Sequence, residues 1–79
     1  MITILTTQDK INLKNDTILA IEKQTEKIEI KDISQSDFIN LIISLKSDPI
    51  IKNFKEITPY MVELNESLVF YDLNKTYSS

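Results

Sequence analysis

Three carboxylates near the C-terminal end of the chain are the residues best placed to do chemistry. Glu63 and Glu66 lie around one predicted turn, and Asp72 lies on the segment that follows it. Paired carboxylates can bind a divalent cation or act as general acid and base. A calcium loop, however, needs several oxygen ligands at set spacing and a glycine at its sharp turn, and the chain has no glycine. We therefore interpret the three acids as an exposed acidic turn and predict no metal site.

The amino-acid types that are missing exclude most other catalytic chemistry. The 79 residues contain no Gly, Cys, His or Trp, and all nine basic residues are lysine. Without Cys and His there is no thiolate nucleophile, no imidazole base and no typical zinc site. Without Gly there is no phosphate-binding glycine loop. We therefore expect a protein that is not an enzyme and uses no cofactor.

Charge and hydropathy narrow the possible partners and the compartment. The net charge of −3 gives no attraction to nucleic acid or to an anionic membrane. Tyr60, Tyr71 and Tyr77 could form a stacking platform for bases, but the acids around them disfavour it. The sequence shows no signal peptide and no apolar run that could span a bilayer, which predicts a cytoplasmic protein. Abundant Ile, Asn and Lys suggest an AT-rich gene, as in low-GC bacteria and their phages and plasmids.

Alternating apolar residues predict strands in the first third of the chain. The segments with this pattern or with a β-branched apolar run are residues 2–5, 11–13, 18–21 and 27–31. Short polar turns between them would place Ile11 opposite Leu19 and Ile21 opposite Ile28, giving one apolar face. The pattern therefore predicts two N-terminal hairpins. Asn and Asp should occupy any positive-φ positions in the turns, because no glycine is available.

The middle of the chain predicts one helix and a second, shorter one. Helical spacing is shown by Phe38, Leu41, Ile42 and Leu45. Ser34 and the residues after it resemble a capping start, and the helix should break at 47–49. Asp48 could then cap a short helix with Pro49 in its first position. The residues that would keep helical spacing there are Ile50, Ile51, Phe54 and Ile57.

The last third predicts a hairpin around Asn65 and Glu66. A two-residue turn pairs Val62 with Val69 on one side of the sheet. The other side then carries Met61 opposite Phe70 and Glu63 opposite Leu68. The predicted fold class is α+β: a small antiparallel sheet with one or two inserted helices, roughly ββββααββ. Residues 1–75 would form a single domain, and 76–79 a frayed tail.

Two surfaces are candidate interaction sites. The first is the second face of the last hairpin, an apolar patch with an acidic rim that is typical of protein-binding surfaces; it comprises Met61, Leu68, Phe70, Glu63, Glu66 and Asp72. The alternative is that the helices bury this face. The second is the over-wide apolar stripe at Ile39 and Ile43, a possible oligomer face unless the second helix or the hairpin covers it.

Three functions follow from these observations. The leading one is a small non-catalytic module that binds a protein partner, a regulator or inhibitor that acts by occupying the partner's surface. In a phage or a mobile element this would include inhibitors of a host enzyme. The alternative is a structural subunit of a homo-oligomer, such as a homodimer or a virion component. An enzyme that uses Asp, Glu or Lys ranks last.

Overall fold

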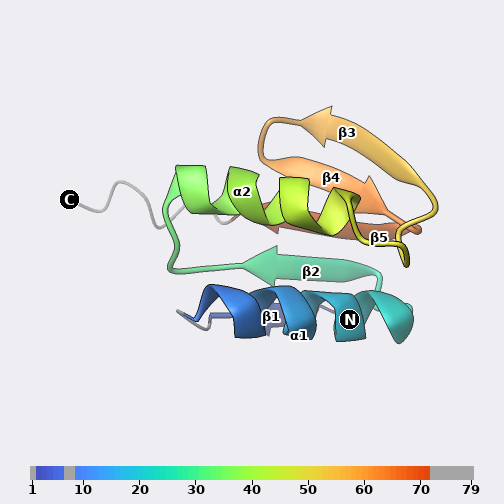
Figure 1. Ribbon diagram of the computed structural model, residues 1–79, viewed down its shortest axis with the longest axis horizontal. Coiled ribbons are helices and arrows are strands. Elements are labelled where there is room, and N and C mark those ends of the chain that lie inside the picture. Colours follow the sequence, from blue (N-terminus) through green and yellow to red (C-terminus); the bar gives the residue numbers. More distant parts are fainter. Residues whose placement is uncertain (1, 7–8, 72–79) are drawn as a thin grey trace.

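The computed structural model describes residues 2–6 and 9–71 and shows a small α+β fold (Figure 1). This confirms the predicted α+β class, although the sheet is mixed rather than antiparallel as predicted. Two helices and five strands follow one another in the order β1 (Ile2–Leu5), α1 (Lys10–Glu22), β2 (Lys27–Ile30), α2 (Gln35–Lys46), β3 (Phe54–Thr58), β4 (Met61–Leu64) and β5 (Ser67–Tyr71).

The five strands form one mixed sheet in the order β1-β2-β5-β4-β3. β2 lies between β1 and β5 and runs parallel to both, whereas β3, β4 and β5 form an antiparallel meander. The predicted register of the last hairpin is confirmed, with Val62 opposite Val69 and Met61 opposite Phe70. The chain ends this meander beside β2, so the last strand joins the two halves of the sheet.

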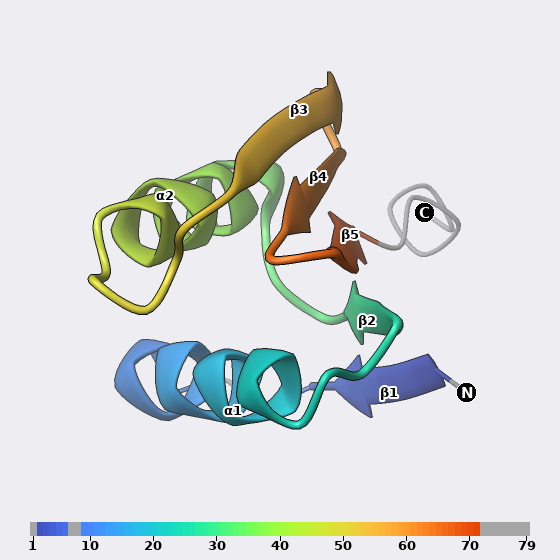
Figure 2. The same cartoon turned by 90° about the vertical axis from the view of Figure 1, so that its right-hand side faces the viewer.

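Both helices pack on the same face of the sheet (Figure 2). The side chains that fill the space between the helices and the sheet form one core, with exposures of 8% or less: Leu13, Ala20, Ile21, Ile28, Ile30, Phe38, Leu41, Ile42, Leu45, Val62, Leu64, Val69 and Tyr71. The predicted helical stripe of α2 supplies four of these residues. The opposite face of the sheet has no helix against it among the described residues.

The first helix corrects the prediction of two N-terminal hairpins. Residues 10–22 form α1, so Ile11 and Leu19 do not pair across strands, and Ile28 pairs with Thr3 and Val69 instead. The buried stripe of α1 consists of Leu13, Thr17, Ala20 and Ile21. Its polar member, Thr17, is fully buried because its hydroxyl donates to the Leu13 carbonyl at 2.7 Å. Because Thr17 is polar, the apolar residues of this segment do not show a helical period, and the exposed Ile11 and Leu19 give it the apolar pattern of strands.

The start of α2 is confirmed and the predicted second short helix is wrong. Ser34 caps α2 by accepting from the Asp37 amide at 3.1 Å. Asp48 does cap the next turn, because its carboxylate accepts from the Ile50 amide at 3.0 Å. The chain then enters β3 rather than a helix, and all five residues of β3 are exposed. The backbone of β3 forms hydrogen bonds with β4. The spacing of apolar residues in the sequence does not indicate this pairing.

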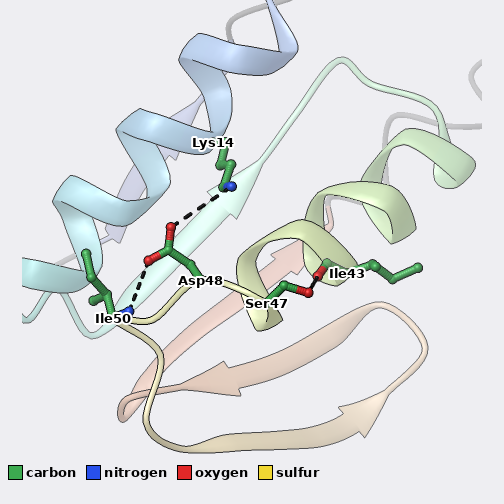
Figure 3. A network of polar contacts seen from close by, with 5 residues as sticks. All are labelled: Lys14, Ile43, Ser47, Asp48 and Ile50. Carbon is green, nitrogen blue, oxygen red and sulfur yellow. Dashed lines mark hydrogen bonds and ion pairs between the residues drawn. The ribbon is translucent and has the colours of Figure 1, made fainter.

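Polar contacts after α2 connect the helices and the loop (Figure 3). The Ser47 hydroxyl donates to the Ile43 carbonyl at 3.1 Å. The second carboxylate oxygen of Asp48 lies 4.0 Å from the Lys14 ammonium on α1. Asp48 thus ties the end of α2 to the side of α1, beyond its local role as a cap.

Asn65 holds the loop before β3 against the β4–β5 turn. Its side-chain oxygen accepts from the amides of Lys52 and Asn53 at 2.8 and 3.0 Å, and its side-chain nitrogen donates to the Ile50 carbonyl at 2.9 Å. Asn65 and Glu66 both have positive φ, 49° and 73°. The other positive-φ residues described are Gln24 and Asp32, so Asn and Asp take only half of these positions.

Candidate protein-binding surface

The helix-free face of the sheet begins with alternate residues of β2. Ile28 and Ile30 have no exposed area and point toward the helices. Because side chains of a strand alternate between the two faces, Lys27 and Glu29 point the other way. Two opposite charges therefore stand two residues apart on an inner strand of the sheet, on the side without helices.

The hairpin of β4 and β5 continues this face, and neither helix buries it. Val62 and Val69 are buried against the helices, while their neighbours Met61, Leu68 and Phe70 are only partly buried. Glu63 lies beside Leu68 in the register. The structure therefore brings four of the predicted site residues together and leaves them uncovered by either helix.

Strand β1 adds two residues that the sequence analysis did not assign to this surface. Ile2 pairs with Lys27 and Ile4 with Glu29, so both isoleucines share the face. They are 48% and 52% exposed. Their alternation with Thr3 and Leu5 was visible in the sequence, but the parallel pairing that aligns β1 with β2 was not.

We call this surface the open face, and the register arranges it in two rows across the strands. The first row comprises Ile2, Lys27, Leu68, Glu63 and Lys55. The second comprises Ile4, Glu29, Phe70, Met61 and Thr58. Apolar side chains thus flank a charged pair on β2, and Glu63 stands opposite Lys55, as favourable cross-strand neighbours do.

Two other predicted site residues lie away from the two rows. Glu66 sits in the turn between β4 and β5 and is exposed, at the end of the open face rather than on it. Asp72 lies outside the described residues. Glu66 lines an open hollow together with Glu63 and Lys55. No group of three or more Asp or Glu residues that could hold a metal ion occurs in the described part of the chain.

The predicted oligomer residues occupy a different surface. Ile39 and Ile43 are 41% and 57% exposed on the outer side of α2, so neither a second helix nor the hairpin buries them. Together with Phe54 they line a shallow pocket of about 180 Å³ beside β3. The Lys46 ammonium lies over the Phe54 ring, 4.5 Å from its centre, which is a cation–π distance. The lysine thereby covers part of this aromatic side chain.

A larger groove of about 640 Å³ lies between α1 and α2, and no sequence signal indicated it. Its walls combine polar side chains, among them Lys14, Asn15, Asn40 and Ser44, with apolar ones that supply most of the lining surface. Ile11, which is 74% exposed, is the large apolar residue that it presents to solvent. The open face presents more apolar side chains, in two rows that continue across the sheet, which favours it as a protein contact.

The described residues contain no buried side-chain nitrogen or oxygen that lacks a hydrogen-bond partner. Aromatic packing near the covered face is also internal, since Tyr71 stacks between Phe38 and Tyr60 at ring distances of 5.4 and 6.2 Å. Within residues 2–6 and 9–71, neither helix is long and apolar enough to cross a membrane. No family model, curated protein or solved structure matches the chain.

Proposed function

We propose that this protein is a small non-catalytic module that binds another protein through the open face, as a regulator or inhibitor that occupies its partner's surface. The observation that carries the proposal is the placement of both helices on one face of the sheet, which leaves apolar side chains on the other. An exposed apolar patch with polar residues around it is the usual anatomy of a protein contact.

The chemistry of the open face suits binding rather than catalysis. Its charged groups are two lysines and two glutamates, and the hollow of about 420 Å³ that Lys55 and Glu63 line is open to solvent. A binding module needs only shape and a few anchor residues. Phe70 is the best anchor, because it is the aromatic side chain in the middle of the sheet on this face.

The test is capture of a partner from a lysate of the cells that produce the protein. Tagged wild type should retain one stoichiometric protein, and Phe70→Asp should reduce the retained amount by about tenfold or more, because a charge replaces the central anchor. Ile4→Asp, at a position already half exposed, provides a second variant that leaves the core untouched.

The matched control is Ile43→Asp, which places the same new charge on the exposed side of α2. It should retain the partner as wild type does. If Ile43→Asp loses the partner while Phe70→Asp and Ile4→Asp keep it, the contact lies on α2 and β3, and the open face is not the binding surface. Circular dichroism of each variant verifies that the domain is folded.

A further inference from the structure

We infer that the open face also binds a second copy of this chain, in a two-fold dimer that a protein target must displace. The inference rests on the proposed function and names the first partner of that surface. It comes from the order of charges and apolar groups along the two rows of the open face.

The two rows are complementary to each other, strand by strand, in apolar character and in charge. At β1 and β5 both rows carry apolar side chains, Ile2 against Ile4 and Leu68 against Phe70. At β2 the rows carry opposite charges, Lys27 against Glu29. A surface whose rows are complementary in this way is complementary to itself.

One orientation of the second copy uses this match. A two-fold axis across the strands, at the level of Ile28, reverses the strand direction and keeps the strand order. The first row of one copy then faces the second row of the other, so Lys27 faces Glu29 of the second copy, and Leu68 faces its Phe70. An axis along the strands over β2 would instead place Lys27 on Lys27 and Glu29 on Glu29, which like-charge repulsion disfavours. An axis along the central strand β5 would pair Lys27 with Glu63 but would leave Glu29 against Met61 and Lys55 against Ile2.

The rest of the two rows is compatible with this arrangement. Glu63 would face Met61 of the other copy, and Lys55 would face its Thr58, so no like-charge contact is created. Lys55 and Glu63 remain cross-strand neighbours within each copy. The charged contacts that decide the orientation are therefore those made by β2.

The size of the face sets the expected strength. Strand spacing of about 4.8 Å and a rise of about 3.3 Å per residue give it roughly 20 Å by 13 Å. This is smaller than the roughly 800 Å² per partner of a standard stable interface. A weak dimer is expected, with a Kd between about 10 µM and 1 mM, which a target with more contacts can outcompete.

The test is a charge-exchange experiment read by sedimentation equilibrium. Lys27→Glu and Glu29→Lys should each weaken the homodimer by about tenfold, because each turns two attractive contacts into repulsive ones. Mixing the two variants should restore a heterodimer to within about threefold of the wild-type Kd, since positions 27 and 29 again carry opposite charges across the axis. Lys52→Glu makes the same charge change on an exposed loop residue off the face and should leave the Kd unchanged.

Each outcome decides between the inference and the proposed function. Restoration on mixing supports the dimer. A wild type that stays monomeric up to about 1 mM, or a dimer that neither charge variant weakens, overturns it. If the wild type is monomeric and Phe70→Asp still loses the captured partner, the proposed function is supported and the open face binds the partner protein but not a second copy. If Phe70→Asp changes neither dimer nor capture, both fail.

Discussion

The two faces of the sheet are built from the same strands and differ in what lies against them. On the covered face, Ile28, Leu64 and Val69 have no exposed area beneath the helices. On the open face, Ile2 and Ile4 keep about half of their surface in water. Burial of apolar area on the covered side therefore supplies most of the free energy of folding, and residues on the open side can change without loss of the fold.

The strongest test of the comparison uses two neighbours on β5. Val69→Asp places a charge against the helices, where it has no partner, and should cost several kcal/mol, enough to unfold a small domain. Phe70→Asp places the same charge on the open face and should lower Tm by about 10 °C at most. Thermal unfolding followed by circular dichroism measures both.

The size-matched control for the covered side is Val69→Ala, which should leave a folded but less stable domain, about 1–3 kcal/mol weaker. If Val69→Asp and Phe70→Asp unfold the domain equally, the two faces contribute equally to folding. The open face would then contribute to folding as a second core surface.

Parts of this contrast could be predicted from the sequence. The turn at Asn65 fixes the register of the last hairpin, and the two-residue loop alone decides which side chains share a face. The stripe of α2 repeats at the helical period and begins at a clear capping residue, Ser34. Local signals of this kind need no knowledge of the rest of the fold.

The helix α1 could not be recognised because its buried and exposed residues carry misleading chemistry. Thr17 is a polar residue at a core position, and Ile11 and Leu19 are apolar residues at exposed positions. The hydroxyl of Thr17 satisfies itself on its own helix, which a pattern of apolar residues does not register. The apolar residues of this segment therefore match neither the helical period nor the strand period clearly.

The full extent of the open face depends on pairings between distant segments. In the sequence, α1 lies between β1 and β2, and 36 residues lie between the end of β2 at Ile30 and the start of β5 at Ser67. Nothing local indicates that Ile4, Glu29 and Phe70 lie in one row. Sequence reasoning could thus find the hairpin part of the surface but not its charged centre or its β1 edge.

A smaller loss of stability is expected from the contact between Asn65 and the loop of residues 50–53, which connects α2 to β3. Asn65→Ala removes three hydrogen bonds to residues 50–53. It also places alanine, which lacks the polar side chain that helps asparagine to tolerate positive φ, at a φ of 49°. It should lower the free energy of unfolding by about 3 kcal/mol. Urea titration measures the change, and the Kd of the dimer should follow wild type wherever the variant is folded.

The control for this loop contact is Asn65→Gly, which accepts positive φ and lacks the side chain. It should lose about 2 kcal/mol, so that the difference from alanine isolates the backbone contribution. Equal losses for the two variants would mean that the hydrogen bonds carry the whole effect. A loss of dimer affinity in a folded Asn65→Gly would show that this loop supports the open face too.

The smallest expected change increases stability. Glu66 has a φ of 73° in a turn whose second position favours glycine, and its side chain is exposed. Glu66→Gly should raise the free energy of unfolding by about 0.5–1 kcal/mol, which is about 4 °C in Tm. Differential scanning calorimetry can resolve this increase.

Glu66→Ala separates the backbone effect from the charge effect, because alanine removes the carboxylate and keeps the Cβ that positive φ disfavours. Only Glu66→Gly should raise Tm, and an equal rise in both variants would assign the gain to the lost charge. Glu66 is also at the end of the open face, so capture of the partner by Glu66→Gly tests its predicted place in the binding surface. A more stable protein that captures less partner would show that folding and binding draw on different residues, which is the separation that the two faces of the sheet predict.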